Sequence, residues 1–292
     1  MPSNRQLGRV AEAIIKNLVT GKTIVVRDLR MVFKIRRKAK KSDTSSNIAD
    51  IEIYNLSPES RKIVETIRTK KGDPQTSIEL KVGYTSGTPT TIFKGKCDVQ
   101  SAYKEPNWVT TFRGEDGTVE FKYSFEKKYS KGTPIGTIVS DIATSSGITS
   151  NTKISLPDKL KKSRTFSGPP LGIIKKLQDT YNFVFDIQDE GTIVRSNKYK
   201  VDAKYLIKVD YKRGLLGQPM RKGNIVIINM LINPLVRPNS FIDLQSQNNS
   251  SLNGKYSIQR VSTVGDSYSG PWTMTVEMID SEAKESVKTE VK

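Results

Sequence analysis

A run of four residues, Thr20-Gly21-Lys22-Thr23, resembles the end of a phosphate-binding loop. Such a loop cradles phosphates with backbone amides, and it needs another glycine five residues before Gly21, a strand before it and a helix after it. Lys16 occupies the position of that glycine. The surrounding pattern predicts a helix followed by a strand, which is the opposite order. We therefore expect no nucleotide site here, and we interpret Gly21 as the residue that ends a helix.

Residues able to carry other common chemistry are scarce. Histidine is absent, which removes Ser-His-Asp and Cys-His nucleophiles and the usual zinc ligand sets. The one cysteine, Cys97, lies in an apolar strand-like run, so we expect a buried, unreactive thiol and no intrachain disulfide. The acidic pairs Glu115-Asp116 and Asp189-Glu190 lie beside glycines in turn-like segments. A glycosidase needs carboxylates that converge on a cleft, which the sequence leaves open but does not indicate. We predict a protein that is not an enzyme, with no catalytic residue, cofactor or metal site.

Positive charge is the strongest compositional signal. Lysine and arginine total 48 against 30 acidic residues, a net charge of +18, which favours a polyanionic or acidic partner. The densest basic run follows a strand and is expected at a hairpin tip. Its candidate interface or lumen residues are Arg36, Arg37, Lys38, Lys40 and Lys41. The run lacks interleaved aromatic residues for stacking on bases. It would therefore attract phosphates without sequence preference, or be an exposed loop with no nucleic-acid role.

A second basic cluster lies between two predicted helices, in the lysine-rich segment 153–164. We expect this segment to be a mobile loop. The candidate residues in it are Lys159, Lys161, Lys162 and Arg164.

The N-terminal segment, residues 1–22, is predicted to be a helical arm. Four apolar residues spaced by three and four form one stripe of a short amphipathic helix, namely Leu7, Val10, Ile14 and Leu18. The helix either packs on its own domain or docks on a neighbouring subunit.

Residues 23–123 are predicted to form a β-rich domain. Alternation of apolar and charged residues over 78–82 is typical of a half-buried strand. Similar runs predict strands at 24–26, 31–35, 51–54, 92–93, 97–99 and 109–112. One helix interrupts the series, because Ser57 is a good N-cap and Pro58 suits the first helical position.

The rest of the chain changes character twice. Residues 124–203 contain two amphipathic helices, beginning near Pro134 and Pro170, and two strands, which predicts a small α+β domain. Residues 204–280 return to a β pattern, and residues 281–292 are charged and expected to be a flexible tail. Trp108 and Trp272 lie in β contexts, where each would be a core or an interface anchor. The fold class is mainly β, with two barrel-like domains flanking an α+β insert.

Targeting signals are not indicated. No apolar run approaches the ~18 residues of a membrane helix, and the N-terminal segment lacks the apolar region of a signal peptide. A single cysteine is consistent with assembly in a reducing cytosol.

Several short motifs occur in the order found in the baseplate hub proteins of contractile-tailed phages, which this chain resembles over roughly residues 23–280. An Ile-Tyr-Asn-Leu strand end is followed by a Ser-Pro-Glu helix, within residues 49–61. Further matching segments are 80–84, 92–95, 114–117, 131–134, 252–258, Gly265-Asp266 and 271–273. The chain departs from the family pattern at Thr263, where a histidine is common.

The resemblance implies a fold and a role. Such hubs resemble the base of the type VI secretion spike, with two tail-tube-like β-barrels in each chain. Three chains would form a pseudo-sixfold ring that adapts a hexameric tail tube to a trimeric spike. The implied partners are two further copies of the chain, tube or tube-initiator proteins and a central spike protein. Non-specific contact with passing DNA would involve the basic residues, and the location would be the virion tail baseplate.

Two other classes of function stay open. A basic nucleic-acid-binding protein would account for the net charge, and its duplex binding would weaken steeply with salt. A tail-associated peptidoglycan hydrolase is disfavoured by the absence of histidine and of a paired-acid motif.

Overall fold

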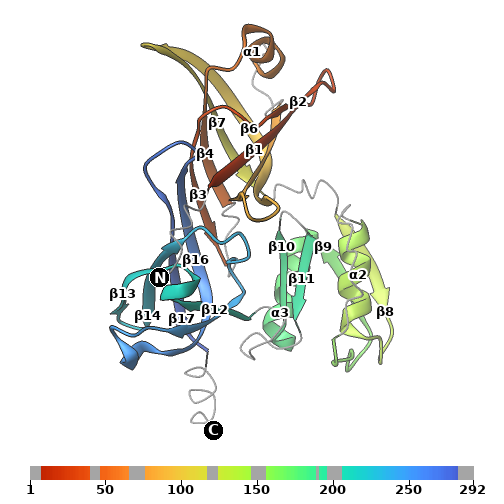
Figure 1. The fold of residues 1–292 in the computed structure, drawn as a ribbon. Coiled ribbons are helices and arrows are strands. Elements are labelled where there is room, and N and C mark those ends of the chain that lie inside the picture. The colour runs from red at the N-terminus through yellow and green to blue at the C-terminus, as the bar shows by residue number, and fades with distance from the viewer. Residues whose placement is uncertain are drawn as a thin grey trace. The chain divides into compact units, whose positions relative to one another are not determined.

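The computed structural model of the chain describes residues 8–39, 47–65, 76–116, 124–145, 156–188, 191–195 and 206–281. These residues fold into two compact units (Figure 1). The larger unit contains the described parts of residues 1–39, 45–116 and 201–292, and the smaller unit contains those of residues 117–200. In sequence, the smaller unit is therefore an insertion into the larger one.

The larger unit is built on one sheet of 13 strands, so the fold is mainly β, as predicted. Its N-terminal part, called the first module here, contains β1 (Arg9–Asn17), β2 (Thr23–Val26), β3 (Met31–Lys38), β4 (Asn47–Tyr54), α1 (Pro58–Val64), β5 (Thr76–Tyr84), β6 (Thr90–Lys104) and β7 (Asn107–Asp116). The second module contains β12 (Leu206–Asp210), η2 (Tyr211–Arg213), β13 (Leu215–Lys222), β14 (Ile225–Leu231), β15 (Phe241–Gln245), η3 (Ser250–Leu252), β16 (Gly254–Asp266) and β17 (Trp272–Asp280).

The order of the strands is the same in the two modules. It reads β3-β4-β7-β6-β5-β1 in the first module and β13-β14-β17-β16-β15-β12 in the second. The modules differ at one end, because β1 is antiparallel to β5 whereas β12 is parallel to β15. The first module compensates with the extra strand β2, which returns the chain before β3 begins. Each module therefore enters its remaining strands in the same direction.

Alternating side chains account for most of the strands. In β5 the side chains of Ile78, Leu80 and Val82 are buried, while the charged residues between them are partly exposed. This period of two is the one that the sequence predicts, because successive side chains of a strand point to opposite faces of the sheet. The predicted helix after β4 is also confirmed as α1. The Ser57 side chain caps it by accepting a hydrogen bond from the amide of Ser60.

The predicted N-terminal helix is wrong over the described residues, because Arg9–Asn17 form strand β1. The buried residues alternate, and they are Ala11, Ala13, Ile15 and Asn17. Pairing with β5 along all nine residues satisfies the backbone of β1, and β2 pairs on its other side. Gly21, with a φ of 73°, lies in the turn between β1 and β2 and not at a helix end. The phosphate-loop-like residues are thus part of a hairpin.

The smaller unit combines two hairpins and two helices. Its elements are β8 (Phe125–Tyr129), α2 (Ile135–Ser145), β9 (Arg164–Gly168), α3 (Pro170–Tyr181), β10 (Val184–Gln188) and β11 (Gly191–Arg195). Both helices were predicted from their apolar stripes. Ile135, Ile138, Val139 and Ile142 of α2 are fully buried, and Ile174 and Leu177 of α3 pack in the same core. Strands β8 and β9 pair antiparallel, although no strand was predicted for either segment.

Cys97 illustrates how the core of the larger unit controls reactivity. Its side chain is 1% exposed within β6. Burial, reinforced by the charge of Asp98, raises the pKa of the thiol to about 12. At pH 8 only on the order of one thiol in ten thousand is therefore ionised, and the thiolate is the reactive form. We expect the native protein to be inert to Ellman's reagent and to react with one equivalent in urea. Rapid reaction of the native protein would contradict this burial.

Candidate functional site

The two modules share a strand. The first part of β16 pairs with β15 of its own module, and the second part pairs with β3 of the first module. The junction between β16 and β3 extends over seven residue pairs, from Arg260 opposite Lys38 to Asp266 opposite Val32. Backbone hydrogen bonding is thus continuous from one module to the other.

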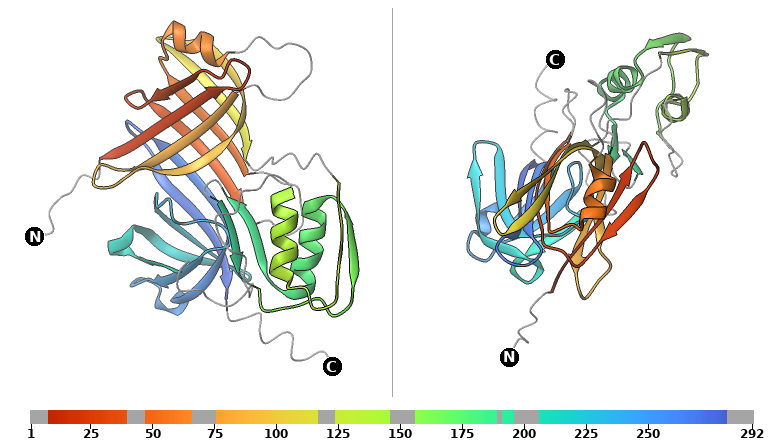
Figure 2. Two further views of the ribbon diagram at one scale, coloured as in Figure 1. Left: turned by 90° about the vertical axis from the view of Figure 1, so that its right-hand side faces the viewer. Right: turned by 90° about the horizontal axis from the view of Figure 1, so that it is seen from above.

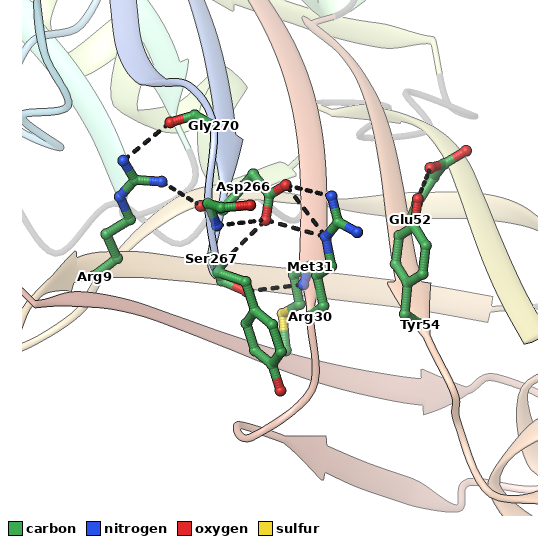
Figure 3. Close-up of polar contacts among 10 residues, drawn as sticks. Arg9, Arg30, Met31, Glu52, Tyr54, Asp266, Ser267 and Gly270 are labelled. Carbon is green, nitrogen blue, oxygen red and sulfur yellow. Dashed lines mark hydrogen bonds and ion pairs between the residues drawn. The ribbon is translucent and has the colours of Figure 1, made fainter. Parts of the chain in front are cut away.

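Asp266 is the centre of a polar cluster at the end of this junction (Figure 3). Its carboxylate is close to the guanidinium of Arg30, with 2.7 Å between Nη2 and Oδ2, and it also accepts hydrogen bonds from the backbone amides of Tyr268 and Ser269. Arg9 of β1 donates to the backbone oxygens of Asp266 and Gly270 at 2.9 and 3.0 Å. One turn of the second module is therefore held by two arginines of the first.

The charges in this cluster are matched. Burial of the Asp266 carboxyl acts to raise its pKa, but hydrogen bonds from Arg30, Tyr268 and Ser269 outweigh burial and lower it. The hydrogen bond to Asp266 raises the pKa of Arg30 further above its ordinary value. Arg30 also lies over the ring of Tyr54, 4.9 Å from the centroid. These contacts favour an ionised, fixed pair and not a group that exchanges protons near neutral pH.

An apolar contact lies beside the polar cluster. Trp272 is 3% exposed, and its ring meets Phe33 edge-on at a centroid distance of 5.5 Å. The guanidinium of Arg9 lies 5.7 Å from the centroid of the Trp272 ring. Tyr84 of β5 donates a hydrogen bond to the backbone oxygen of Ile232 at 3.0 Å, which adds a second link between the modules. The junction is suited to holding two modules in a fixed register, and it has no arrangement suited to a reaction.

The residues of the first basic candidate set, from Arg36 to Lys41, differ in their surroundings. Arg36, Arg37 and Lys38 lie in β3 and not at a hairpin tip, because pairing with β16 continues to Lys38. Arg37 is only 7% exposed, whereas Arg36 and Lys38 are exposed. Lys40 and Lys41 lie outside the described residues. Only Arg36 and Lys38 of the set are thus available at the described surface.

The residues of the second basic candidate set lie on a segment of the smaller unit that packs on the core of that unit through Leu160. Leu160 is buried, and its amide donates to the oxygen of Thr133 at 2.9 Å. Lys159 forms an isolated β-bridge with Pro134. Lys161 and Lys162 are exposed, and Arg164 begins β9. These residues contribute a basic surface to the smaller unit.

The two tryptophans have different surroundings. Trp272 is buried at the junction, whereas Trp108 of β7 is 41% exposed. Arg61 of α1 lies 4.1 Å from the centroid of the Trp108 ring, and Tyr103 of β6 packs at 5.6 Å. Figure 1 shows α1 at the end of the first module, beside the tips of β6 and β7.

Sequence reasoning found only part of the junction. Trp272 is predicted as a core or an interface anchor, whereas Asp266 enters only within a short motif, and Arg9 and Arg30 have no predicted role in a junction. Of the acidic pairs, Asp189-Glu190 lies outside the described residues, and Glu115-Asp116 ends β7 opposite Lys96 and Gly95. Within the described ranges, no group of three or more acidic or cysteine side chains is arranged to hold a metal. None of the described helices has the length and apolar character to span a membrane.

Comparison with solved structures shows a shared fold at low sequence identity. The 43 kDa tail protein of prophage MuSo2 from Shewanella oneidensis is 10% identical, with a TM-score of 0.59 over 93% of this chain and 97% of that one. The tail protein from Neisseria meningitidis MC58 is 7% identical, with a TM-score of 0.56 and coverages of 94% and 96%. The Escherichia coli c3393 protein is 11% identical, with a TM-score of 0.53 and coverages of 87% and 73%.

The c3393 protein is described as a component of the type VI secretion system with structural similarity to the phage T4 tail proteins gp27 and gp5. No curated protein matches the chain. A family model does match, described as Baseplate hub gp41, and it covers residues 13–278. This match confirms the resemblance inferred from the motifs. The family is structural and not enzymatic. The chain therefore belongs to the Baseplate hub gp41 family and is a structural component of a phage tail baseplate.

Proposed function

We propose that three copies of this chain form a pseudo-sixfold ring that joins the hexameric tube of a contractile tail to its trimeric spike. The repeated strand order carries the proposal, because two like modules in one chain let three copies present six similar units. The strands of each module curve (Figure 2), which supports two tube-like β-barrels, one built from the described strands of residues 8–116 and one from those of residues 206–280.

The junction supports the same proposal. A ring that transmits force between tube and spike needs modules fixed in register. The continuous pairing of β3 with β16 and the Arg9–Asp266–Arg30 cluster provide that within one chain. The ring's neighbours would be tube or tube-initiator proteins on one side and the spike protein on the other. The likeness of c3393 to gp27 and gp5 supports a place at the base of the spike.

DNA passing through the ring would meet some of the exposed cations. The described sheet is less basic than the net charge implies, however. On one row across β3, β4, β7 and β6, positive and negative residues alternate as Lys34, Asp50, Arg113 and Asp98. Neighbouring opposite charges reduce the field that a phosphate would feel. We infer weak, sequence-independent contact through the sheet residues that the structure describes.

The ring is tested by cryo-electron microscopy of intact tails. We expect three copies of the chain on the tail axis, with six similar densities facing the tube and threefold symmetry facing the spike. Six copies in a true sixfold ring, or a position away from the axis, would overturn the proposal.

A further inference from the structure

Residue pairing makes the two modules comparable position by position. Trp108 of β7 lies directly opposite Tyr103 of β6, and Trp272 of β17 lies directly opposite Gly265 of β16. Aligning the two tryptophans places the buried residues of β7 and β17 in register, with Thr110 matching Met274 and Phe112 matching Val276. It also matches residues 98–104 of β6 with residues 260–266 of β16, which is the segment that pairs with β3.

The matched segments differ in what covers them. Residues 260–266 have β17 on one side and β3 on the other. Residues 98–104 have β7 on one side, while β5 pairs only with the earlier part of β6, and no other described strand takes the place of β3. Exposure follows this difference. Trp108 and Tyr103 are 41% and 58% exposed, whereas Trp272 is 3% exposed and Gly265 is buried. The first module thus exposes the edge that the second module buries.

The complementary edge is at the other end of the sheet. β13 matches β3 in the strand order, but in the described chain it pairs only with β14. The backbone oxygen of Pro219 accepts a hydrogen bond from the Asn249 side chain, which leaves the last three residues of β13 for a new partner. All three are exposed, and they are Met220, Arg221 and Lys222.

We propose that β6 of one copy pairs with β13 of the next copy, which repeats between chains the junction that β16 and β3 form within a chain. This inference rests on the proposed ring. The register follows from the match between the modules. Within the chain, Arg36 of β3 pairs with Ser262 of β16. Arg36 corresponds to Lys222 of β13, and Ser262 corresponds to Gln100 of β6. Gln100 therefore lies opposite Lys222, Ser101 opposite Arg221 and Ala102 opposite Met220.

The chemistry of the two edges fits this register. Asp98, two residues before Gln100 on the same face of β6, comes diagonal to Lys222, where opposite charges attract. Each copy offers one edge of each kind, so the contact is head-to-tail and closes into a ring. The interchain ladder has three residue pairs against seven in the intrachain junction. It is therefore weaker, and it is best tested in the assembled tail.

A cysteine pair tests the register directly. Directly opposite residues of antiparallel strands have Cα atoms about 4.5–5.5 Å apart, within the range that a disulfide spans. In tails that contain S101C/R221C, we expect mild oxidation to convert most of the chain to covalent trimers and nothing larger. The S101C and R221C single variants should stay monomeric, and so should V25C/R221C, which uses the other end strand, β2. Dimers from S101C alone would overturn the head-to-tail contact.

A second variant keeps the test independent of oxidation. In tails assembled from a mixture with wild type, we expect W108A to be incorporated at least about tenfold less than wild type. L235A, whose residue is 63% exposed in the second module, should be incorporated equally. The unfolding midpoint of the free W108A chain should match that of wild type within experimental error. Threefold rings without S101C/R221C cross-links and with normal W108A incorporation would overturn the pairing alone. Absence of the ring would overturn the proposed function as well.

Discussion

Replacing Gly265 with alanine is expected to lower the free energy of unfolding of the larger unit by about 2–3 kcal/mol. Gly265 lies directly opposite Phe33 in the junction, and a Cβ atom there would collide with the Phe33 ring, with two ring carbons only 2.6 and 2.7 Å away. The ring cannot move aside easily, because it is 1% exposed and packs against Trp272. Urea denaturation, followed through tryptophan fluorescence, to which Trp108 and the buried Trp272 both contribute, measures the shift in midpoint.

Two further variants separate the collision from a general effect of alanine. A Cβ atom added at Gly87, which lies in a turn, would meet nothing within 4 Å, so G87A should change the midpoint little. Replacing the Phe33 ring with the smaller leucine side chain in F33L makes room for the Cβ atom that G265A adds. The loss of unfolding free energy in F33L/G265A should therefore be smaller than the sum of the losses in the two single variants. A G265A protein within about 0.5 kcal/mol of wild type would show that the junction adapts freely.

Local patterns in the sequence were sufficient where one element decides its own structure. The cap at Ser57 and the apolar stripe of α2 are signals of this kind, and the alternation in β5 is another. The same use of local patterns gave the wrong result for the N-terminal segment, which forms strand β1. Val10 and Ile14 are four apart, as in a helix, but small alanines occupy the core positions between them. Pairing with β5, which is distant in the sequence, decides the structure of β1, and a local period does not contain that information.

The junction was beyond sequence reasoning for a related reason. Asp266 and Arg30 are 236 residues apart, and neither has a local neighbour that predicts the other. The basic run from Arg36 to Lys41 is predicted at a hairpin tip, because it follows a strand and precedes the polar segment 42–46. Pairing with β16 keeps Arg36 and Lys38 in the strand with their side chains outward. The register between the two modules is also not evident from the sequence, because the strand order is repeated while most of the aligned side chains differ.

Replacing Asp266 with alanine is the second large expected effect, a loss of about 2–3 kcal/mol in the free energy of unfolding. The variant removes the acceptor of the Arg30 guanidinium and of the Tyr268 and Ser269 amides, at a residue that is 5% exposed. D266N should lose less, because its side-chain oxygen still accepts from the turn amides. Glu277 provides a matched control, since its ion pair with Arg260 at 2.9 Å is more exposed, and E277A should cost under about 1 kcal/mol.

The effect of Asp266 should also depend on pH in a defined direction. The pKa of Asp266 in the folded protein lies below its ordinary value, because the hydrogen bonds from Arg30 and the turn outweigh the opposing effect of burial. The unfolded chain therefore binds a proton more readily than the folded one as the pH falls. The stabilisation by the carboxylate is complete above the unfolded pKa of about 3.9 and is lost as the pH falls through the folded value. Urea midpoints of wild type and D266N should thus differ by a constant amount from about pH 5 to 7 and converge below about pH 4. A difference that persists unchanged to about pH 2 would mean that the charge of Asp266 does not hold the two modules together.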